Sequence, residues 1–403
     1  MVRGKSSAVR GLPAIAGAPL AVECLRRWNK YLRRHQYTAE TLRQTFGIRC
    51  ADEFGLGERE VWAEHLRAQS NSAQPWFQLF WLEQPLQREV ADKLAPDLVE
   101  LGLRAGLLRE NKNHLIASLR AEPVVSNIVW SDRRFERPLQ RSVVRRRGGP
   151  VYPPSADSHM LAEVLPPMTG QQLLDLCTGS GVLAILAAQA GAKVTGVDID
   201  ARAVELATLN ALANGLPNLT FVCGNLYEPV HQRRFHSIVA NPPFVCSPYT
   251  GGPRYHSGGP LGDEILRPIV AGFATYLHRG GTAVTISHVG LRAGESLSDR
   301  ARTWLGNFDG RALVVEFERA DIVRFAAAQA GFALAEGLAS YKRELHRWLR
   351  FLRRHWVHEV AAIFLAAERS GKPQLEVVSA KPVVVPVPLN KSAAQVVKEW
   401  WPC

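Results

Sequence analysis

The feature that most constrains the fold is a series of seven short apolar runs between residues 171 and 370. Most of them are separated by segments with helical periodicity. The runs are QLLDL, KVTGVD, LTFVC, HSIVA, GTAVTIS, ALVVEFE and EVAAIFLA. Short apolar runs that alternate with helices are typical of a mainly parallel sheet covered on both faces. The sequence therefore predicts an α/β domain built on a seven-stranded sheet.

The segment before this sheet has a different character, and 403 residues suffice for two or three domains. Residues 20 to about 120 show helical patterns, AEPVVSNIVWSDRRF predicts a strand pair, and RSVVRRRGGPVYPPSADS predicts a basic linker. We expect a disordered leader over 1–19, a mainly helical recognition domain over 20–145, the sheet domain over 146–380 and a tail over 381–403. The expected core anchors of the helical domain are Trp28, Trp62, Trp76 and Trp81.

Composition and charge limit the compartment, the metal content and the partners that we expect for the chain. Six cysteines show neither a C-x-x-C pair nor metal-ligand spacing, which favours a reducing cytoplasm and no metal site. No apolar run reaches the ~20 residues of a membrane-spanning helix, so we expect no membrane partner. The net charge of +12 favours an acidic partner or a nucleic acid, although charge alone mainly reports on solubility and non-specific binding.

The first loop of the sheet, in LDLCTGSGVLAILAAQAG, predicts a cofactor-binding turn. Gly179 and Gly181 allow a tight turn and close backbone approach, and the helix that begins at Val182 presents its N-terminus there. The next strand ends at Asp198, whose carboxylate can accept hydrogen bonds from both hydroxyls of a ribose. A nicotinamide dinucleotide suits this arrangement too, so the turn alone leaves an oxidoreductase open.

The fourth strand, HSIVA, ends in Asn241, Pro242, Pro243 and Phe244. We call these four residues the acceptor box. Two prolines hold the backbone extended, and we expect the box at the point where the strand order reverses. The Asn241 oxygen and the Pro242 carbonyl are two acceptors that converge on one N–H₂ group, while the Phe244 ring can stack on a planar amide or base. The box therefore predicts a site that aims the lone pair of a nitrogen.

The motifs DLCTGSG, VDID and NPPF, in this order and spacing, resemble class I methyltransferases that use S-adenosylmethionine, and NPPF resembles their amino-methylating branch. Upstream, VYPPSADSHML is similar to the segment that closes over the cofactor in HemK-type glutamine methyltransferases. Downstream, SGGPLGDEILRPIV is similar to their Gly-Gly-x-x-Gly-Asp motif. The resemblance covers about residues 150 to 290 and implies a Rossmann-like methyltransferase sheet with S-adenosylmethionine as cofactor.

The resemblance implies a role for each matching residue. It assigns the acceptor box, Asn241 to Phe244, to catalysis. Three departures from the family pattern concern Cys177 in place of glycine, Asn225 in place of aspartate and Phe244 in place of tyrosine. The residues implied in cofactor binding are Tyr152, Asp157, Asp175, Cys177, Thr178, Gly179, Gly181, Asp198, Asn225, Leu226 and Asn241.

The acceptor stays open at this point. The HemK-like flanks favour a planar amide or amine nitrogen of a protein, peptide, peptide-like natural product or other small molecule. The charge and Phe244 favour RNA, with adenine N6 or guanine N2 as acceptor. A nicotinamide-dependent oxidoreductase and a non-catalytic binding protein are the remaining alternatives.

Two further segments carry functional hypotheses. SYKRELHRWLRFLRRH predicts an amphipathic basic helix, which is either a cover helix with a solvated face or a docking surface for RNA or an acidic protein. VCSPYTGGPRYHSGGP is too long for a plain turn and predicts a substrate-contacting loop. His256 in this loop is a possible general base, although a loop histidine is more often simply solvated.

Overall fold

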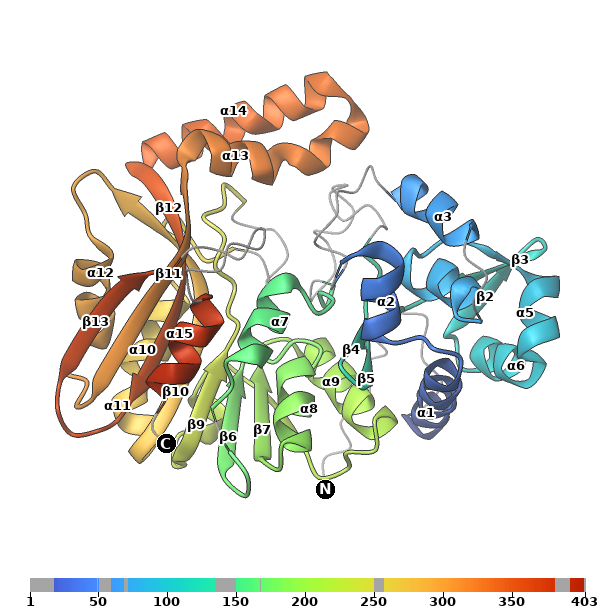
Figure 1. The fold of residues 1–403 in the computed structure, drawn as a ribbon, viewed down its shortest axis with the longest axis horizontal. Helices are drawn as coiled ribbons and strands as arrows, with labels where there is room; N and C mark the ends of the chain where they lie inside the picture. The colour runs from blue at the N-terminus through green and yellow to red at the C-terminus, as the bar shows by residue number, and fades with distance from the viewer. Residues whose placement is uncertain are drawn as a thin grey trace, which may run out of the picture.

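The computed structural model of the chain describes residues 18–48, 50, 59–68, 72–134, 150–166, 168–249, 257–380 and 392–401 (Figure 1). The expected leader up to residue 17, most of the basic linker and the middle of the expected substrate loop lie outside the described residues.

The large sheet has eight strands, so the predicted count of seven is wrong. All seven predicted runs form strands in it, and the additional strand β13 pairs in parallel with β11 at one edge. The strand order is β13-β11-β12-β10-β9-β6-β7-β8. The strands are β6 (Gln172–Leu176), β7 (Lys193–Asp198), β8 (Thr220–Cys223), β9 (Phe235–Ala240), β10 (Leu277–Arg292), β11 (Arg311–Asp321), β12 (Val357–Glu368) and β13 (Gln374–Ser379).

The direction of the strands defines the functional edge of this sheet. β12 runs antiparallel to β10 and β11, whereas the other neighbouring strands pair in parallel. The strand order reverses between β9 and β6, as the sequence predicts, so the acceptor box and the glycine turn follow adjacent strands at one edge. Ligands bind at such a reversal in open α/β sheets.

Helices cover both faces of the sheet (Figure 1). Apolar side chains of α10 (Leu266–Ala271), α11 (Phe273–Tyr276) and α12 (Leu297–Leu305) pack on one face. α7 (Ala156–Glu163), α8 (Val182–Gln189) and α15 (Ala393–Trp400) pack on the other. The described part of the expected C-terminal tail is thus a packed helix, anchored where the Trp401 indole donates to the Val164 carbonyl (3.0 Å). None of the described helices is long and apolar enough to cross a bilayer.

The N-terminal part is helical first and then turns to strands. Trp28, Trp76 and Trp81 are fully buried, as predicted, and the predicted strand pair is the hairpin β4–β5. A small sheet β1-β3-β2 was not expected from the sequence. The elements are α1 (Ala18–Arg34), α2 (Ala39–Phe46), α3 (Arg59–Arg67), α4 (Gln74–Trp76), the π-helix η3 (Phe77–Trp81), β1 (Leu86–Gln87), α5 (Arg88–Leu94), α6 (Pro96–Arg104), β2 (Leu108–Asn111), β3 (His114–Ala117), β4 (Arg120–Val124) and β5 (Asn127–Ser131).

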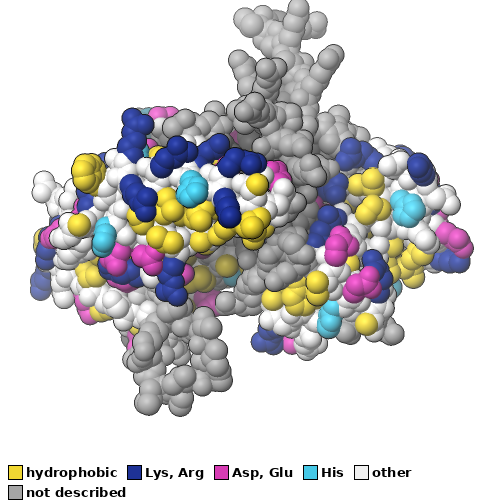
Figure 2. Space-filling model, turned by 90° about the horizontal axis from the view of Figure 1, so that it is seen from above, with side chains coloured by type: hydrophobic (Ala, Val, Ile, Leu, Met, Phe, Trp, Pro, Cys, Tyr) yellow, Lys and Arg dark blue, Asp and Glu magenta, His cyan; other side chains and the backbone are white. Residues whose placement is uncertain are grey.

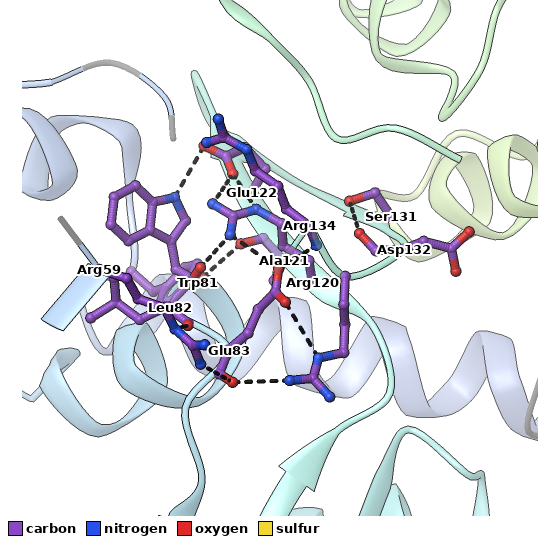
Figure 3. Close-up of polar contacts among 12 residues, drawn as sticks. Arg59, Trp81, Leu82, Glu83, Arg120, Ala121, Glu122, Ser131, Asp132 and Arg134 are labelled. Carbon is purple, nitrogen blue, oxygen red and sulfur yellow. Dashed lines mark hydrogen bonds and ion pairs between the residues drawn. The ribbon is translucent and has the colours of Figure 1, made fainter. Parts of the chain in front are cut away.

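A buried charged network holds this part together (Figure 3). The Arg120 guanidinium is fully buried and donates to the Glu122 carboxylate from Nε (2.9 Å) and Nη2 (2.8 Å). Arg120 also pairs with Glu83, at 3.4 Å, and the Trp81 indole donates to Glu122 (3.1 Å). Buried charges need such partners, because an unpaired buried charge is strongly destabilising.

The two parts meet along α9 (Ala201–Ala213). The buried Asn210 amide accepts from the Trp130 backbone N–H (2.8 Å) and donates to the Trp130 carbonyl (2.8 Å), so it pairs with β5 as a neighbouring strand would. Its amide group donates also to the Ser180 carbonyl (2.9 Å), in the glycine turn. Apolar residues of α9 join the core of the N-terminal part.

A helical hairpin is inserted between β11 and β12 (Figure 1). It consists of α13 (Ile322–Ala330), the 3₁₀ turn η6 (Gly331–Glu336) and α14 (Leu338–Arg354). Asp321 ends β11 and caps α13, because its carboxylate accepts from the N–H groups of Val323 and Arg324. The hairpin stands at the functional edge of the sheet, where Trp348 and Leu352 share an apolar cluster with Cys246, which follows the acceptor box.

Candidate active site

The glycine turn has the predicted geometry. Gly179 and Gly181 adopt φ of 53° and 81°, and α8 begins at Val182. A Cβ on Gly181 would lie 2.9 Å from Ala207 Cβ of α9, whereas a Cβ on Gly179 would meet only the Cys177 carbonyl, at 4.0 Å. Gly181 therefore allows helix packing, and Gly179 leaves room for a ligand to approach. Cys177 also has a positive φ (59°), a conformation that costs a non-glycine residue about 1–2 kcal/mol.

Asp175 presents an unsatisfied oxygen beside this turn. Its carboxylate is buried, Oδ2 accepts from the Thr178 hydroxyl (2.6 Å), and Oδ1 has no hydrogen-bond partner among the described residues. Burial raises the pKa of Asp175 to about 7, and the Thr178 hydrogen bond opposes that rise. A buried carboxylate in this state gains from an incoming cation, which removes the cost of ionising it.

Asp198 joins the end of β7 to the glycine turn. Its Oδ2 accepts from the Gly179 N–H (2.9 Å), and its Oδ1 accepts from the Asp200 N–H (2.9 Å). Burial raises its pKa, opposed by these hydrogen bonds. Two backbone hydrogen bonds therefore fix the orientation of the Asp198 carboxylate at the end of β7. After β8, Asn225 is exposed and donates to Glu228 (3.2 Å), and a 3₁₀ turn, η5 (Glu228–Val230), follows.

The acceptor box follows β9 directly. The Asn241 amide nitrogen donates to the Ser158 hydroxyl of α7 (3.3 Å), which directs the amide oxygen away from α7. No donor among the described residues pairs with the Asn241 side-chain oxygen or with the Pro242 carbonyl. Two acceptor oxygens are thus available at one turn.

The Phe244 side chain is more buried than a ring that is free to stack on a ligand from solvent. It is 9% exposed and packs on the His288 imidazole of β10, with ring centroids 4.6 Å apart and planes at 50°. The His288 Nδ1 is buried without a partner among the described residues, and burial lowers the pKa of His288 to about 4. A neutral imidazole therefore supports the ring at neutral pH.

A glycine-rich loop backs the acceptor box. A Cβ on Gly258 would lie 2.6 Å from Phe244 Cα, and one on Gly262 would lie 2.5 Å from the Phe244 carbonyl oxygen. Only glycine permits this approach. The Asp263 carboxylate, buried at the end of the loop, accepts from Arg300 (2.5 Å) and the Trp304 indole (2.8 Å). The Gly-Gly-x-x-Gly-Asp segment therefore fixes the backbone of the box.

The predicted site residues lie in several places in the structure. Asp175, Cys177 to Gly181 and Asp198 lie at the glycine turn, Tyr152 precedes α7, and Asp157 lies in the first turn of α7. Asp157 accepts from the Ser155 hydroxyl at 3.5 Å, and Leu226 adopts a positive φ of 47°. His256 and the rest of residues 250–256 lie outside the described residues. Tyr249, from the expected substrate loop, donates instead to Glu344 of α14.

Sequence reasoning missed two residues of the site, Ser158 and His288. Ser158 contacts Asn241 across 83 residues, and His288 sits in the middle of a strand whose apolar neighbours dominate the pattern. Thr282, Thr285 and Ser287 lie in the same strand, so the sequence carries no signal that singles out His288.

The donor set fits S-adenosylmethionine. Asp175 offers an unpartnered buried carboxylate oxygen for an ammonium group, Gly179 offers open space, and Asp198 offers a fixed carboxylate for ribose hydroxyls. Among the described residues no group of three or more His, Cys, Asp or Glu side chains could hold a metal ion.

Comparisons with known proteins match this part of the chain. The family model described as "Methyltransferase small domain" matches residues 155–303. The ribosomal protein uL3 glutamine methyltransferase of Bordetella pertussis is 34% identical over 173 residues, 38% of this chain and 58% of that protein. The release factor glutamine methyltransferase of Thermodesulfovibrio yellowstonii is 38% identical over 79 residues, 19% of this chain and 28% of that protein. The matches thus span less than two thirds of both relatives.

Another relative is matched over more of its length. A protein of Methanocaldococcus jannaschii named "Putative protein N5-glutamine methyltransferase" is 34% identical over 139 residues, 32% of this chain and 68% of that protein. Among solved structures, a ribosomal protein L11 methylase from Lactobacillus delbrueckii subsp. bulgaricus is 27% identical, covering 32% of this chain and 56% of that chain. Its TM-score is 0.24.

Proposed function

This chain belongs to the methyltransferase small-domain family, and on that premise we propose that it transfers a methyl group from S-adenosylmethionine to the side-chain amide nitrogen of a glutamine in a protein. The names of the relatives support glutamine as acceptor, with a ribosomal protein or a release factor as the class of protein. We extend the proposal to the N-terminal part, residues 20–145, as the element that recognises the acceptor protein.

One observation carries the proposal. The Asn241 side-chain oxygen and the Pro242 carbonyl both lack a donor among the described residues, while Ser158 holds the Asn241 amide nitrogen. An amide N–H₂ has two hydrogens, and two acceptor oxygens at one turn can take both. An acceptor held in this way has its nitrogen lone pair fixed in direction, and such positioning supplies a large share of the rate of group transfer.

When bound, S-adenosylmethionine would supply a methyl group on a sulfonium centre. Its transfer would break the sulfur–methyl bond and leave a neutral thioether, while the amide nitrogen gives up one of its two protons to solvent. The chain's own residues would bind and orient: Asp175 the ammonium group of the cofactor's methionine part, Asp198 its ribose hydroxyls, and the acceptor box the amide. Phe244 and His288 exclude water from one side of the box, and His288 is neutral at pH 7 because burial lowers its pKa to about 4.

The test uses the full-length protein, methyl-labelled S-adenosylmethionine and a cell extract fractionated into protein, RNA and small molecules. We expect label in protein, recovered as N5-methylglutamine after enzymatic digestion to amino acids. Asn241→Ala should lower the initial rate at least ~100-fold, because the amide loses one of its two anchors. Asn111→Ala, a substitution of the same kind on exposed β2, should leave the rate unchanged.

Three results would contradict the proposal. Label mainly in RNA would make the acceptor a base, and label insensitive to Asn241→Ala would remove the box from the mechanism. Binding of a nicotinamide dinucleotide in place of S-adenosylmethionine would favour an oxidoreductase.

A further inference from the structure

The outward face of α14 is a strongly basic surface. This helix carries six Lys or Arg side chains and one carboxylate, and all six cations are exposed. At 100° per residue the six fall within an arc of about 140°, together with His346, and they extend over about 18 Å along the helix axis. The members of this basic face are Lys342, Arg343, Arg347, Arg350, Arg353 and Arg354.

The single carboxylate of the helix does not neutralise this face. Glu344 is 15% exposed, turns toward the loop after the acceptor box, accepts from the Tyr249 hydroxyl and, among the described residues, pairs with Arg347 alone (3.1 Å). Within the described part of the chain no carboxylate pairs with the other five cations. Figure 2 shows the dark blue side chains in a row along the hairpin, with yellow apolar side chains beside them.

An exposed aromatic residue closely follows the basic face in the chain. Trp356 is 77% exposed and follows Arg353 and Arg354 by one turn, where its N–H donates to the Arg353 carbonyl (3.0 Å). Its φ is +59°, a conformation in which glycine or asparagine is the ordinary choice. A tryptophan that adopts a strained backbone while its ring stays in water lacks a folding rationale, and such an outlier points to binding.

From this combination we propose that the basic face of α14, with Trp356, binds single-stranded RNA. Arginines in line track a phosphate backbone, and an exposed aromatic ring provides a stacking platform for a base. An acidic protein would use the arginines but would not need the tryptophan. The proposal does not depend on the identity of the methyl acceptor.

The position of the hairpin relates the proposed RNA-binding face to the acceptor box. α14 packs through Trp348 on Tyr249, with ring centroids 6.0 Å apart, and Tyr249 lies five residues after Phe244. RNA bound to the basic face would therefore lie at the same edge of the sheet as the acceptor box. Such an RNA would bring the enzyme to an acceptor presented by a ribonucleoprotein.

The test measures binding of a fluorescein-labelled 20-nucleotide single strand of mixed sequence by anisotropy, with the full-length protein at salt concentrations from 50 to 300 mM. Arg343→Gln, Arg350→Gln and Arg354→Gln combined should weaken binding at least 10-fold. The slope of log affinity against log salt should become shallower by about 2, since each lost phosphate contact on a single strand accounts for about 0.7. A control with Arg104→Gln, Lys112→Gln and Lys372→Gln removes the same charge from exposed sites elsewhere and should leave the slope unchanged.

Trp356→Asn isolates the stacking part, because asparagine tolerates the positive φ. We expect affinity to fall 5-fold or more with the salt slope unchanged. Equal slopes for the two triple variants would overturn the proposal. So would binding of poly-glutamate as tight as that of RNA, together with RNA affinity insensitive to Trp356→Asn, since that result assigns the face to an acidic protein.

Discussion

At the scale of single residues, the buried Asp175 carboxylate makes cofactor binding depend on pH. Its pKa is raised to about 7 by burial, so the free protein holds it partly protonated at neutral pH. An ammonium group needs the ionised form. Affinity for S-adenosylmethionine should therefore increase about 8-fold between pH 6 and pH 7.5, the ratio of the ionised fractions. Calorimetric titration of Asp175→Asn should show weaker binding with this dependence lost, and an unchanged pH dependence would contradict the role.

His288 should make the stability of the fold depend on pH in another range. The unfolded chain has an ordinary histidine pKa near 6.5, whereas burial lowers the folded value to about 4. The unfolded state therefore takes up a proton between these values and the folded state does not, so stability falls as pH drops from 6.5 to 4. Urea unfolding at pH 6.5 and 4.5 should show a smaller loss for His288→Phe than for the wild type. An equal loss would contradict this assignment.

The sequence predicts a candidate site residue where that residue belongs to a recognisable local motif. Asp198 is the last residue of β7 and Asn241 directly follows β9, and the apolar runs already mark both strands. Ser158 and His288 were not predictable, because each acts through a contact with a residue more than 40 positions away. The burial of Phe244 against His288 likewise depends on strand pairing between β9 and β10, which no local pattern contains.

At the scale of elements, the sequence predicts strands with continuous apolar runs and misses those without them. β13 alternates half-buried and exposed residues at the sheet edge, so its pattern resembles that of a loop. α15 was expected to be part of a tail, because only a few apolar residues, among them Val397 and Trp401, attach it to the sheet. Edge elements of this kind depend on tertiary packing more than on their own pattern.

The charged network around β4 should be the most sensitive polar element of the N-terminal part (Figure 3). Arg120→Met would leave the Glu122 carboxylate buried without its cation, which costs about 3–5 kcal/mol. Arg43→Met, the same substitution at an exposed pair with Glu40, should cost less than about 1 kcal/mol. Both are measured by urea unfolding followed by tryptophan fluorescence. Equal losses would mean that the network does not stabilise the fold.

At the scale of the whole molecule, the N-terminal part and the sheet domain share a core along α9. Leu206 and Leu209 of α9 pack with the N-terminal cluster, and Arg202 forms an ion pair with Asp132. The domain boundary that the sequence predicts near residue 145 does not reveal this shared core, because α9 lies about 60 residues after that boundary. Deletion of the N-terminal part would expose the apolar face of α9, so point substitutions are the cleaner test of how the two parts communicate.

Asn210 is the residue through which the N-terminal part reaches the cofactor turn. Asn210→Ala would leave the Trp130 N–H, the Trp130 carbonyl and the Ser180 carbonyl without this partner, all in buried surroundings. At about 1–3 kcal/mol for each unsatisfied group, the free energy of unfolding should fall by at least about 3 kcal/mol. Affinity for S-adenosylmethionine should fall as well, because Ser180 belongs to the glycine turn. Asn111→Ala on exposed β2 is the matched control for both measurements. If Asn210→Ala lowers stability but leaves affinity unchanged, the two parts are joined only structurally, and the turn is held by its own glycines and Asp198.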